Sequence, residues 1–344
     1  MADVTIRGAG IFGLSIAWEC ARRGAQVQVV DPHGPGAGAS GGLVGALAPH
    51  VPENWNPKKA FQFESLVMAR AFWADVEETG GVASGYGRLG RLQPISDAAA
   101  LALARKRAET ANELWQGKAD WDVVSTGGVS GWCPPSPTGF VIHDTLSARI
   151  HPRRACAALV AALGVRGVKI VTDAPDRGRV LHATGVAGLS ELSAHFGKTI
   201  GNGVKGQAAL LRFGAGAVPQ IFADSLHFIP HADGTLAIGS TSERDYDHPE
   251  TTDTALEDVI DRAMRVLPVL HGAEIIDRWA GVRPRTRSRA PMLGRHPVVP
   301  DQFIANGGFK IGFGMAPKIA EVMADLLIEG RDSIPADFLP EASL

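Results

Sequence analysis

Cysteine is scarce in this chain of 344 residues, and the three that occur exclude several kinds of site. Cys20, Cys133 and Cys156 lie far apart and form neither a CxxC pair nor a metal-binding spacing. Because secreted proteins with disulfides usually carry paired cysteines, this usage indicates reduced thiols and a cytoplasmic protein. The spacings of histidine, cysteine and acidic residues also predict no metal site.

Long apolar runs and a strong excess of one charge are missing as well. No apolar run reaches about 18 residues, and no basic segment followed by an apolar one opens the chain, so we expect neither a transmembrane helix nor a signal peptide. Lys and Arg number 34 against 36 Asp and Glu, and the formal charge of −2 gives no support to bulk nucleic-acid binding. The sequence also lacks the HExxH, GxSxG and Walker motifs.

Glycine, in contrast, is abundant, with 41 residues, which indicates many tight turns and close approaches of the backbone to a ligand. The clearest pattern lies at the start of the chain. Residues 4–7 predict a strand, residues 8–13 form the turn GAGIFG, and residues 14–23 have the apolar spacing of a helix. A second strand follows over residues 25–30 and ends at Asp31.

Each part of this unit suits a dinucleotide. Gly8 permits the tight turn, Gly10 lets the backbone approach a pyrophosphate, and Gly13 lets the helix pack on the strand. The helix N-terminus offers free N–H groups and a partial positive charge to the phosphates. Asp31 can accept hydrogen bonds from the ribose hydroxyls and disfavours the extra phosphate of NADP. The unit therefore predicts a dinucleotide site, and the alternative is a glycine-rich turn in a plain α/β fold.

A run of small residues follows the acid, over residues 34–46. Small side chains would let an extended cofactor lie against the main chain, with Ser40 and backbone N–H groups as donors. The alternative is a flexible linker, although Leu43 and Val44 make the segment apolar for that role.

Several segments together carry a resemblance to a known family. They are GAGASGGLVGALAPH (36–50), HATG (182–185), VKGQ (204–207), FIPHADGTLAIGSTSE (228–243), WAGVRPRTRSRAPMLGRHP (279–297) and NGGFKIGFGMAPKIAEVMADLL (306–327). With the N-terminal turn, they make the chain resemble the FAD-dependent D-amino acid oxidase superfamily. It is most similar to the glycine oxidase branch, which serves thiamine biosynthesis in bacteria.

The resemblance implies an α/β fold in which a Rossmann-type FAD-binding domain is interleaved with a mixed-sheet substrate domain. We expect the FAD-binding domain to comprise residues 1–80, 145–205 and 281–344, and the substrate domain to comprise residues 81–144 and 206–280. The periodicity agrees with this fold. It predicts strands at 90–95, 168–171, 179–182, 206–213 and 235–240, and helices at 97–115, 152–163, 254–267 and 315–328.

The resemblance also implies roles for individual residues. Arg283 matches the family's arginine that holds the substrate carboxylate, and its planar fork of donors suits a carboxylate. Lys310 would be a second contact to substrate, or alternatively a solvated surface lysine. Relatives often have an active-site tyrosine in the strand that here contains Phe228. Phe228 can shape the pocket but cannot donate a hydrogen bond, which leaves open whether glycine itself is the substrate. The residues expected to contact the cofactor are Gly8, Gly10, Ile11, Phe12, Gly13, Asp31, Pro32, Ala39, Ser40, Gly42, Leu43, Gly45, Ala46, Gly185, Arg283, Gly308, Phe309, Lys310, Ile311, Gly312 and Phe313.

The resemblance further implies that the last helix directs its N-terminus at the pyrimidine edge of the flavin, where a partial positive charge stabilises the reduced anion. Arg285, Arg287 and Arg289 follow Arg283 in the sequence at intervals of two residues. They are either a solvated loop or a basic rim at the mouth of the active site, favouring a substrate with an extra anion.

The expected activity follows from these assignments. We expect noncovalent FAD, because the cysteine that attaches flavin in the sarcosine oxidase branch lies late in the chain and none occurs here after Cys156. The substrate would be a small amino acid or N-substituted glycine, oxidised at its C–N bond by hydride transfer to the flavin. Oxygen is the expected acceptor, giving an imine and hydrogen peroxide. No nucleic-acid partner is expected, and an oligomer is possible.

Three alternatives stay open at this stage. One is an amino acid dehydrogenase that passes electrons to a quinone or carrier. Another is an FAD oxidase acting on a modified tRNA wobble base, because the small-residue loop and ALAP (46–49) resemble such an enzyme. The third is a non-catalytic flavin-binding partner protein.

Overall fold

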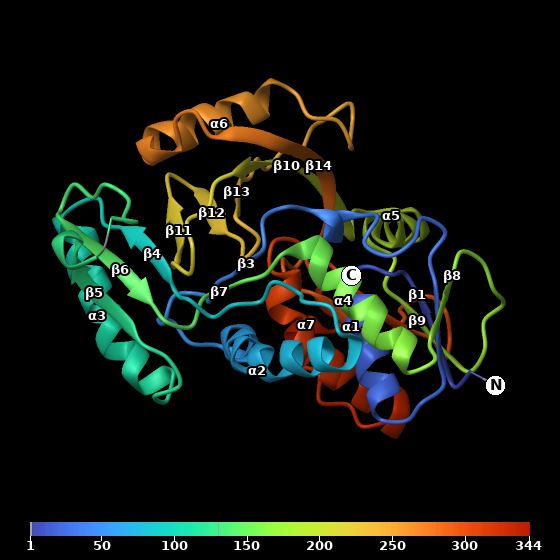
Figure 1. The fold of residues 1–344 in the computed structure, drawn as a ribbon. Helices are drawn as coiled ribbons and strands as arrows, with labels where there is room; N and C mark the ends of the chain where they lie inside the picture. Colours follow the sequence, from blue (N-terminus) through green and yellow to red (C-terminus); the bar gives the residue numbers. More distant parts are fainter. Residues whose placement is uncertain (1, 130) are drawn as a thin grey trace.

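Two large β-sheets organise the protein in the computed structural model, which describes residues 2–129 and 131–344 (Figure 1). The first has six strands in the order β15-β16-β9-β1-β2-β8, and the second has eight in the order β14-β10-β13-β12-β11-β4-β6-β5. A two-stranded sheet pairs β3 (Ala46–Leu47) with β7 (Ala148–Arg149). Figure 1 shows α6 above the eight-stranded sheet, with α1, α2, α4 and α7 grouped below.

The six-stranded sheet is mostly parallel, as expected for a Rossmann-type domain. Its strands are β1 (Val4–Arg7), β2 (Val27–Val30), β8 (Lys169–Val171), β9 (Arg179–His182), β15 (Met292–Arg295) and β16 (Phe303–Asn306). β1 lies between β2 and β9 and pairs in parallel with both, whereas the edge strand β15 is antiparallel to β16. The predicted strands at 168–171 and 179–182 are confirmed, and both join this sheet.

Helices from distant parts of the chain pack on this sheet or on the helices that cover it. They are α1 (Ile11–Arg22), α2 (Pro57–Gly80), α4 (Pro152–Val165), α5 (Gly185–Phe196) and α7 (Gly312–Ala324). Every residue of α1 from Ile11 to Ala21 is buried, because the helix lies among β1, β2, β16, α4 and α7. A mostly apolar helix that is buried on all sides is typical of a core position.

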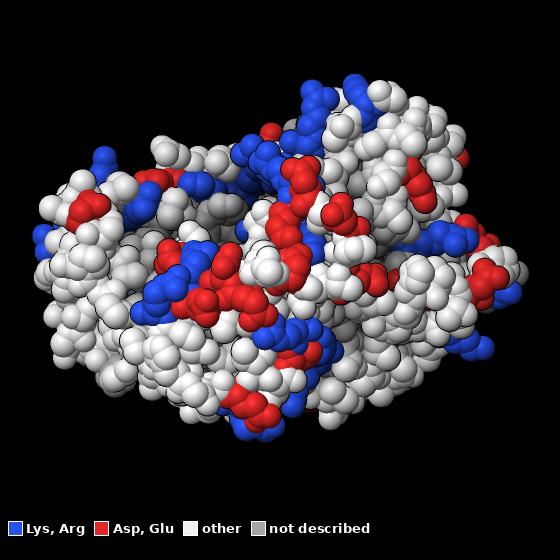
Figure 2. Space-filling view, turned by 90° about the horizontal axis from the view of Figure 1, so that it is seen from above, with Lys and Arg blue, Asp and Glu red and all other residues white. Residues whose placement is uncertain are grey.

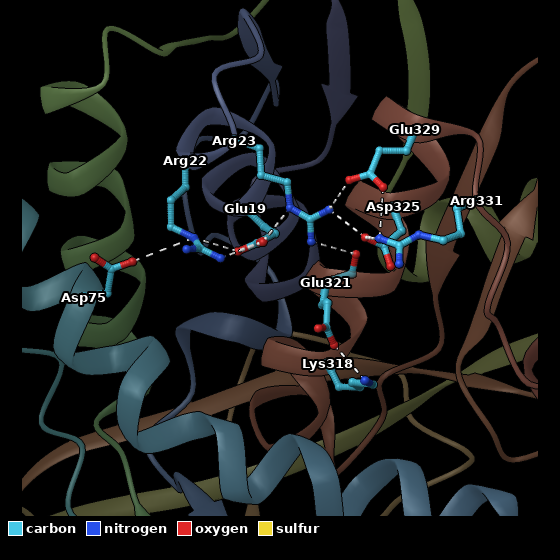
Figure 3. Close-up of polar contacts among 9 residues, drawn as sticks. All are labelled: Glu19, Arg22, Arg23, Asp75, Lys318, Glu321, Asp325, Glu329 and Arg331. Atoms are coloured by element: carbon cyan, nitrogen blue, oxygen red, sulfur yellow. Dashed lines mark hydrogen bonds and ion pairs between the residues drawn. The ribbon is translucent and has the colours of Figure 1, made fainter.

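A charged network joins the end of α1 to the C-terminal part of the chain (Figure 3). Arg23, which follows α1, donates to Glu19 at 2.7 Å and to Asp325 at 2.6 Å. Asp325 begins a short π-helical segment, η4 (Asp325–Glu329), that continues α7. The side chains of Glu19 and Asp325 are 6% and 9% exposed, so Arg23 neutralises two nearly buried carboxylates.

The eight-stranded sheet is mixed, as expected for the substrate domain. It contains β4 (Arg91–Pro94), β5 (Trp121–Ser125), β6 (Phe140–Asp144), β10 (Gly201–Arg212), β11 (Gln220–Ala223), β12 (Leu226–Pro230), β13 (Thr235–Gly239) and β14 (Glu274–Thr286). The pair β11–β4 is parallel and the other neighbours are antiparallel. Helix α6 (Thr254–Val266) covers an apolar cluster on this sheet, and α3 (Ala98–Leu114) packs on β5.

The long β10–β14 ladder crosses two of the expected domain boundaries. The two strands pair from Gly201–Thr286 to Arg212–Glu274, so the expected boundaries at 205/206 and 280/281 fall within continuous strands. The strand predicted at 206–213 therefore begins earlier, at Gly201. The division into two domains stays a prediction.

The remaining expected elements are present with shifted ends. Helix α7 begins at Gly312, three residues before the predicted start, and Pro317 lies inside it. Short 3-10 segments occur at Ala39–Gly41 (η1), Thr126–Gly128 (η2), Pro268–Leu270 (η3), Ala336–Phe338 (η5) and Pro340–Ala342 (η6). Within the described residues, no helix is both long and apolar enough to cross a membrane. The face shown in Figure 2 carries acidic and basic groups interspersed.

Candidate active site

A cavity of about 1290 Å³ lies where three segments meet. They are the glycine turn (8–13), the small-residue loop (34–46) and the loop before α7 (307–311). It is larger than the roughly 300–1,000 Å³ usual for small-ligand sites, so it has room for a dinucleotide and a small substrate together. The expected residues that line it are Gly8, Gly10, Ile11, Phe12, Asp31, Pro32, Ala39, Ser40, Gly42, Leu43, Gly45, Ala46, Gly185, Arg283, Gly308, Phe309, Lys310, Gly312 and Phe313.

The three glycines of the N-terminal turn differ in what surrounds them. Gly8 has a φ of +109°, and a Cβ there would lie 2.3 Å from the Ala183 carbonyl oxygen. A Cβ at Gly13 would lie 1.9 Å from the Gly8 oxygen, so Gly13 serves the packing of helix on turn and lies behind the cavity wall. A Cβ at Gly10 would meet only the Ser40 hydroxyl, at 3.2 Å. Gly10 thus presents bare backbone to the cavity.

Beside the glycine turn, the polar side chains of Asp31 and Ser40 are held in place by hydrogen bonds from backbone N–H groups. The Asp31 carboxylate accepts hydrogen bonds from the N–H groups of Ala9 at 2.7 Å and His33 at 2.9 Å. Ser40 accepts from the N–H of Ile11 at 2.9 Å, which ties the small-residue loop to the start of α1. The loop also contains the helical turn η1, and a Cβ at Gly45 would overlap the Ile150 carbonyl oxygen at 1.8 Å. The loop is therefore packed against the fold, and the flexible-linker alternative is wrong.

Arg283 occupies the opposite part of the cavity, on β14, and is 7% exposed. Its Nη2 donates to the Ser240 hydroxyl at 2.8 Å and to the Thr241 carbonyl at 3.3 Å, whereas Nη1 is buried without a partner. Burial lowers the pKa of Arg283 to about 10, although nearby Glu243 opposes the shift. A buried guanidinium with a free nitrogen on a cavity wall is suited to bind a carboxylate.

Gly206 makes room for this arginine. It lies on β10, opposite Gly281 of β14, and a Cβ added to it would come within 1.4 Å of Arg283 Nη2. The VKGQ segment thus contributes to the site through the absence of a side chain. Sequence reasoning used this segment only as a family motif.

Lys310 and Arg285 flank the ring of Phe309. Their charged groups lie 5.7 Å and 5.5 Å from its centroid, and Phe309 itself adopts a left-handed φ of +42°. Lys310 lines the cavity but is exposed at its mouth. Partial desolvation, followed by repulsion from Arg283 and Arg285, lowers its pKa. The side chain is therefore solvated and at the same time positioned to reach a ligand at the mouth.

Phe228 does not face the cavity, so the expectation that it shapes the pocket is wrong. Side chains alternate along β12, and the fully buried Phe228 packs into the cluster with Leu256 and Ile260 beneath α6. His227, the preceding residue, lines the cavity instead. The two-residue period of the strand predicts that the two residues face opposite sides of the sheet, but not which of them faces the cavity. Ile311 and Gly13 are the other expected residues outside the cavity lining.

His227 is a functional candidate that sequence reasoning missed. Its Nδ1 is buried and has no hydrogen-bond partner, and its ring lies 4.7 Å from that of Phe222. Burial, with smaller effects from Arg91, Lys310 and Arg283, lowers its pKa to about 3. The imidazole is therefore neutral at physiological pH and can accept or donate one hydrogen bond. Other unpredicted lining residues include Thr184, Ser240, Trp279 and Asn306.

Arg285, Arg287 and Arg289 do not line this cavity. They line a separate smaller pocket, and only Arg285 approaches the cavity, through Phe309. Among the described residues, no group of three or more His, Cys, Asp or Glu side chains could hold a metal ion.

The fold and the cavity define a protein with a Rossmann-type dinucleotide site, and comparisons with known proteins give the family. A model described as FAD dependent oxidoreductase matches residues 3–326. The chain therefore belongs to the FAD dependent oxidoreductase family and is an FAD-dependent oxidoreductase. The predicted resemblance to the D-amino acid oxidase superfamily and the predicted fold class are confirmed.

Individual relatives indicate the branch. Glycine oxidase of Pseudomonas putida is 27% identical over 380 residues, covering 99% of both chains. The bifunctional protein ThiO/ThiG of Synechocystis is 27% identical over 367 residues and covers 96% of this chain, which spans only 52% of that relative. The crystal structure of glycine oxidase from Geobacillus kaustophilus has a TM-score of 0.84 at 21% identity, covering 98% of each chain.

The cavity fits the cofactor of this family. Helices α1 and α7 both begin at its wall, and neither N-cap residue caps its helix with a side chain, although the N–H of Ile11 in α1 is bound by the Ser40 hydroxyl. Their free N–H groups and positive dipole ends favour anionic groups of a ligand. Bare backbone at Gly10 and the fixed carboxylate of Asp31 complete a surface suited to a pyrophosphate and a ribose.

Proposed function

We propose that the protein holds FAD noncovalently in this cavity and oxidises the C–N bond of a small amino acid or an N-substituted glycine. The observation that carries the proposal is Arg283, a buried guanidinium whose Nη1 has no partner, on the wall of the same cavity as the dinucleotide turn. The glycine oxidase relatives support an amino acid as substrate.

The chain's own residues would hold the cofactor at three places. The bare backbone at Gly10 and the positive end of the α1 dipole would bind the pyrophosphate, and Asp31 would accept hydrogen bonds from the adenosine ribose. The N-terminus of α7 and the preceding glycines would lie beside the flavin ring. None of the three cysteines lines the cavity, which supports noncovalent binding.

On the substrate side, Arg283 would bind the carboxylate and fix the position of the adjacent carbon. Ser240 holds one guanidinium nitrogen at 2.8 Å, so the guanidinium is oriented before the substrate arrives. Neutral His227 would offer its unpartnered nitrogen within the same pocket without attracting a second anion. Bound FAD would supply the hydride acceptor, with oxygen taking the electron pair to give hydrogen peroxide beside the imine product.

An anaerobic screen of amino acids tests the proposal, with the flavin absorbance as readout. We expect at least one small amino acid or N-substituted glycine to bleach the flavin, and one hydrogen peroxide to form per substrate oxidised in air. Flavin that no amine reduces would contradict the enzymatic assignment. Substrate oxidation that proceeds only with a quinone would contradict oxygen as acceptor.

Arg283→Ala tests the anchoring residue. Loss of a charge-assisted carboxylate contact costs about 1.5–3 kcal/mol per hydrogen bond, so kcat/KM is expected to fall roughly 100-fold. Arg278→Ala, which removes an exposed arginine of the same strand, is the matched control and is expected to retain activity. Both variants should keep their FAD. Unchanged kcat/KM in Arg283→Ala would refute the role.

A further inference from the structure

A second pocket, of about 470 Å³, lies at one end of the β10–β14 ladder. None of its lining residues is shared with the large cavity. It is formed by Lys198, Thr199, Gly201, Asn202, Arg244, Arg285, Thr286, Arg287 and Arg289. Its lining residues on β10 and β14 lie opposite each other in the ladder, since Gly201 pairs with Thr286 and Asn202 with Arg285.

The charges in this pocket are all of one sign. Five of the lining residues are basic and none is acidic. Across the described residues, none of these five side chains forms an ion pair or donates a hydrogen bond to the protein; Arg285 only contacts the Phe309 ring. Basic residues elsewhere are commonly paired, for example Arg212 with Glu274 and Arg262 with Asp224. Because the whole chain carries a formal charge of −2, the cluster does not reflect a general basic excess.

The backbone that carries the arginines is fixed. The N–H of Arg287 donates to the Ile200 carbonyl at 2.8 Å, and the N–H of Arg289 donates to the Thr286 carbonyl at 3.2 Å. The Thr286 hydroxyl closes the turn by donating to the Ala290 carbonyl at 2.5 Å. Arg289 has a left-handed φ of +62°, which turns the chain back beside the pocket. A ligand would therefore order side chains but not the loop itself, which lowers the entropic cost of binding.

We propose that this pocket binds a small anion with two or more negative charges, of the phosphate or diphosphate class, separately from the large cavity. Guanidinium forks match phosphate oxygens in pairs, and five unpartnered cations exceed what a single carboxylate would neutralise. The pocket's volume and the absence of aromatic side chains from its lining favour a compact anion over a stacked single-stranded nucleic acid.

Calorimetric titration of the FAD-loaded Arg283→Ala variant tests this site, because bound FAD occupies the dinucleotide part of the large cavity and the substitution removes the guanidinium that could bind an anion in the rest of it. Pyrophosphate, inorganic phosphate and ADP are the probes, and acetate at the same ionic strength is the comparison. We expect one saturable site for pyrophosphate and none for acetate. Similar affinity for ADP and pyrophosphate would identify the free diphosphate group as the ligand, whereas tighter ADP binding would identify a nucleotide.

Two variants locate the site. Lys198→Gln and Arg287→Gln leave the wall of the large cavity unchanged, and each is expected to weaken pyrophosphate binding about tenfold, since a hydrogen bond to a charged group contributes about 1.5–3 kcal/mol. Arg212→Gln removes an exposed arginine elsewhere and serves as the charge-matched control.

The proposal fails if no phosphate-class probe binds saturably, or if Arg212→Gln weakens binding as much as the pocket variants do. It also fails if the surface binds tRNA or anionic vesicles while pyrophosphate neither binds nor displaces them. These outcomes do not depend on turnover, so they are separate from the test of the amino acid oxidase activity.

Discussion

At the scale of single residues, Arg283 shows how a glycine can create a binding group. Its Nη2 fits beside β10 and donates to Ser240 because Gly206 has no side chain there, and its Nη1 is buried without a partner. An unpaired buried charge is costly for folding, so its presence here indicates a ligand rather than a structural role.

Gly206→Ala is expected to displace Arg283 without unfolding the protein, because the three atoms nearest the added Cβ all belong to the end of the Arg283 side chain and none to the backbone. We expect kcat/KM for the amino acid substrate to fall roughly tenfold or more, in line with the loss of a charge-assisted contact, while FAD stays bound. Gly214→Ala is the control, since its nearest neighbour would be 4.0 Å away. Equal activity in both variants would show that Gly206 has no part in placing the arginine.

His231 gives the fold a dependence on pH. It is 3% exposed, its ring lies 4.5 Å from that of His151, and its Nε2 lies 3.2 Å from the Leu43 carbonyl of the small-residue loop. Burial, and then repulsion from His151, lowers its pKa to about 4. Between the unfolded pKa near 6.5 and this value, the unfolded chain binds a proton that the folded chain does not.

Stability should therefore fall as the pH falls through this window, and His231 alone should account for ~2 kcal/mol between pH 8 and pH 5. Urea unfolding at the two pH values measures the loss. We expect His231→Gln to lose less stability than the parent, whereas His248→Gln, at an exposed position, should behave like the parent. An identical loss in the parent and His231→Gln would exclude the residue as the source.

At the scale of elements, the junction between α1 and η4 depends on Arg23. Both of its main partners, Glu19 and Asp325, are nearly buried carboxylates. Figure 3 shows that each of them also contacts a second arginine, Arg22 for Glu19 and Arg331 for Asp325. Arg331 contacts the same Asp325 at 2.8 Å, but its side chain is 60% exposed. Arg23 and Arg331 thus pair with the same carboxylate, Asp325, but the side chain of Arg23 is much less exposed to solvent.

Arg23→Met is expected to destabilise the protein by about 2 kcal/mol, because it leaves Glu19 and Asp325 with fewer partners at low exposure. Arg331→Met is expected to cost about 1 kcal/mol or less, as exposed ion pairs usually do. Denaturant midpoints of the FAD-loaded variants measure both effects. Equal destabilisation would mean that burial does not distinguish the two pairs.

The orientation of strand β12 in the sheet determines which of its side chains face the cavity, and the sequence motif does not. The motif located the strand, but only its orientation in the sheet determines that His227 faces the cavity and Phe228 faces α6. The pocket therefore has a nitrogen donor or acceptor at the position where the sequence led us to expect an apolar ring.

At the scale of the whole molecule, the cavity joins segments from both ends of the chain. Residues after β1, β2, β9 and β16, together with residues within β14, all contribute to its wall. A ligand that contacts all of them should stabilise the folded state as a unit, by about 2.7 kcal/mol when it is present at 100 times its Kd.

Gly10→Ala tests this linkage. The added methyl group would meet only Ser40 at 3.2 Å in the protein, so the apoprotein is expected to unfold near the parent temperature. The methyl group would project where the pyrophosphate approaches, so the rise in Tm on adding FAD should shrink. Thermal unfolding with and without FAD measures it. If FAD raised the Tm of Gly10→Ala as much as that of the parent, the pyrophosphate would not lie against Gly10.

The sequence by itself determined the glycine turn, the acid after the second strand, the arginine at 283 and the family, because these depend on local patterns of residue type and spacing. Tertiary structure alone decided that Gly206 clears space for that arginine, that His227 lines the pocket, and that the neighbouring arginines belong to a second pocket. The physical reason is that these features are contacts between strands far apart in the chain. They depend on register and side-chain direction, which no local pattern specifies.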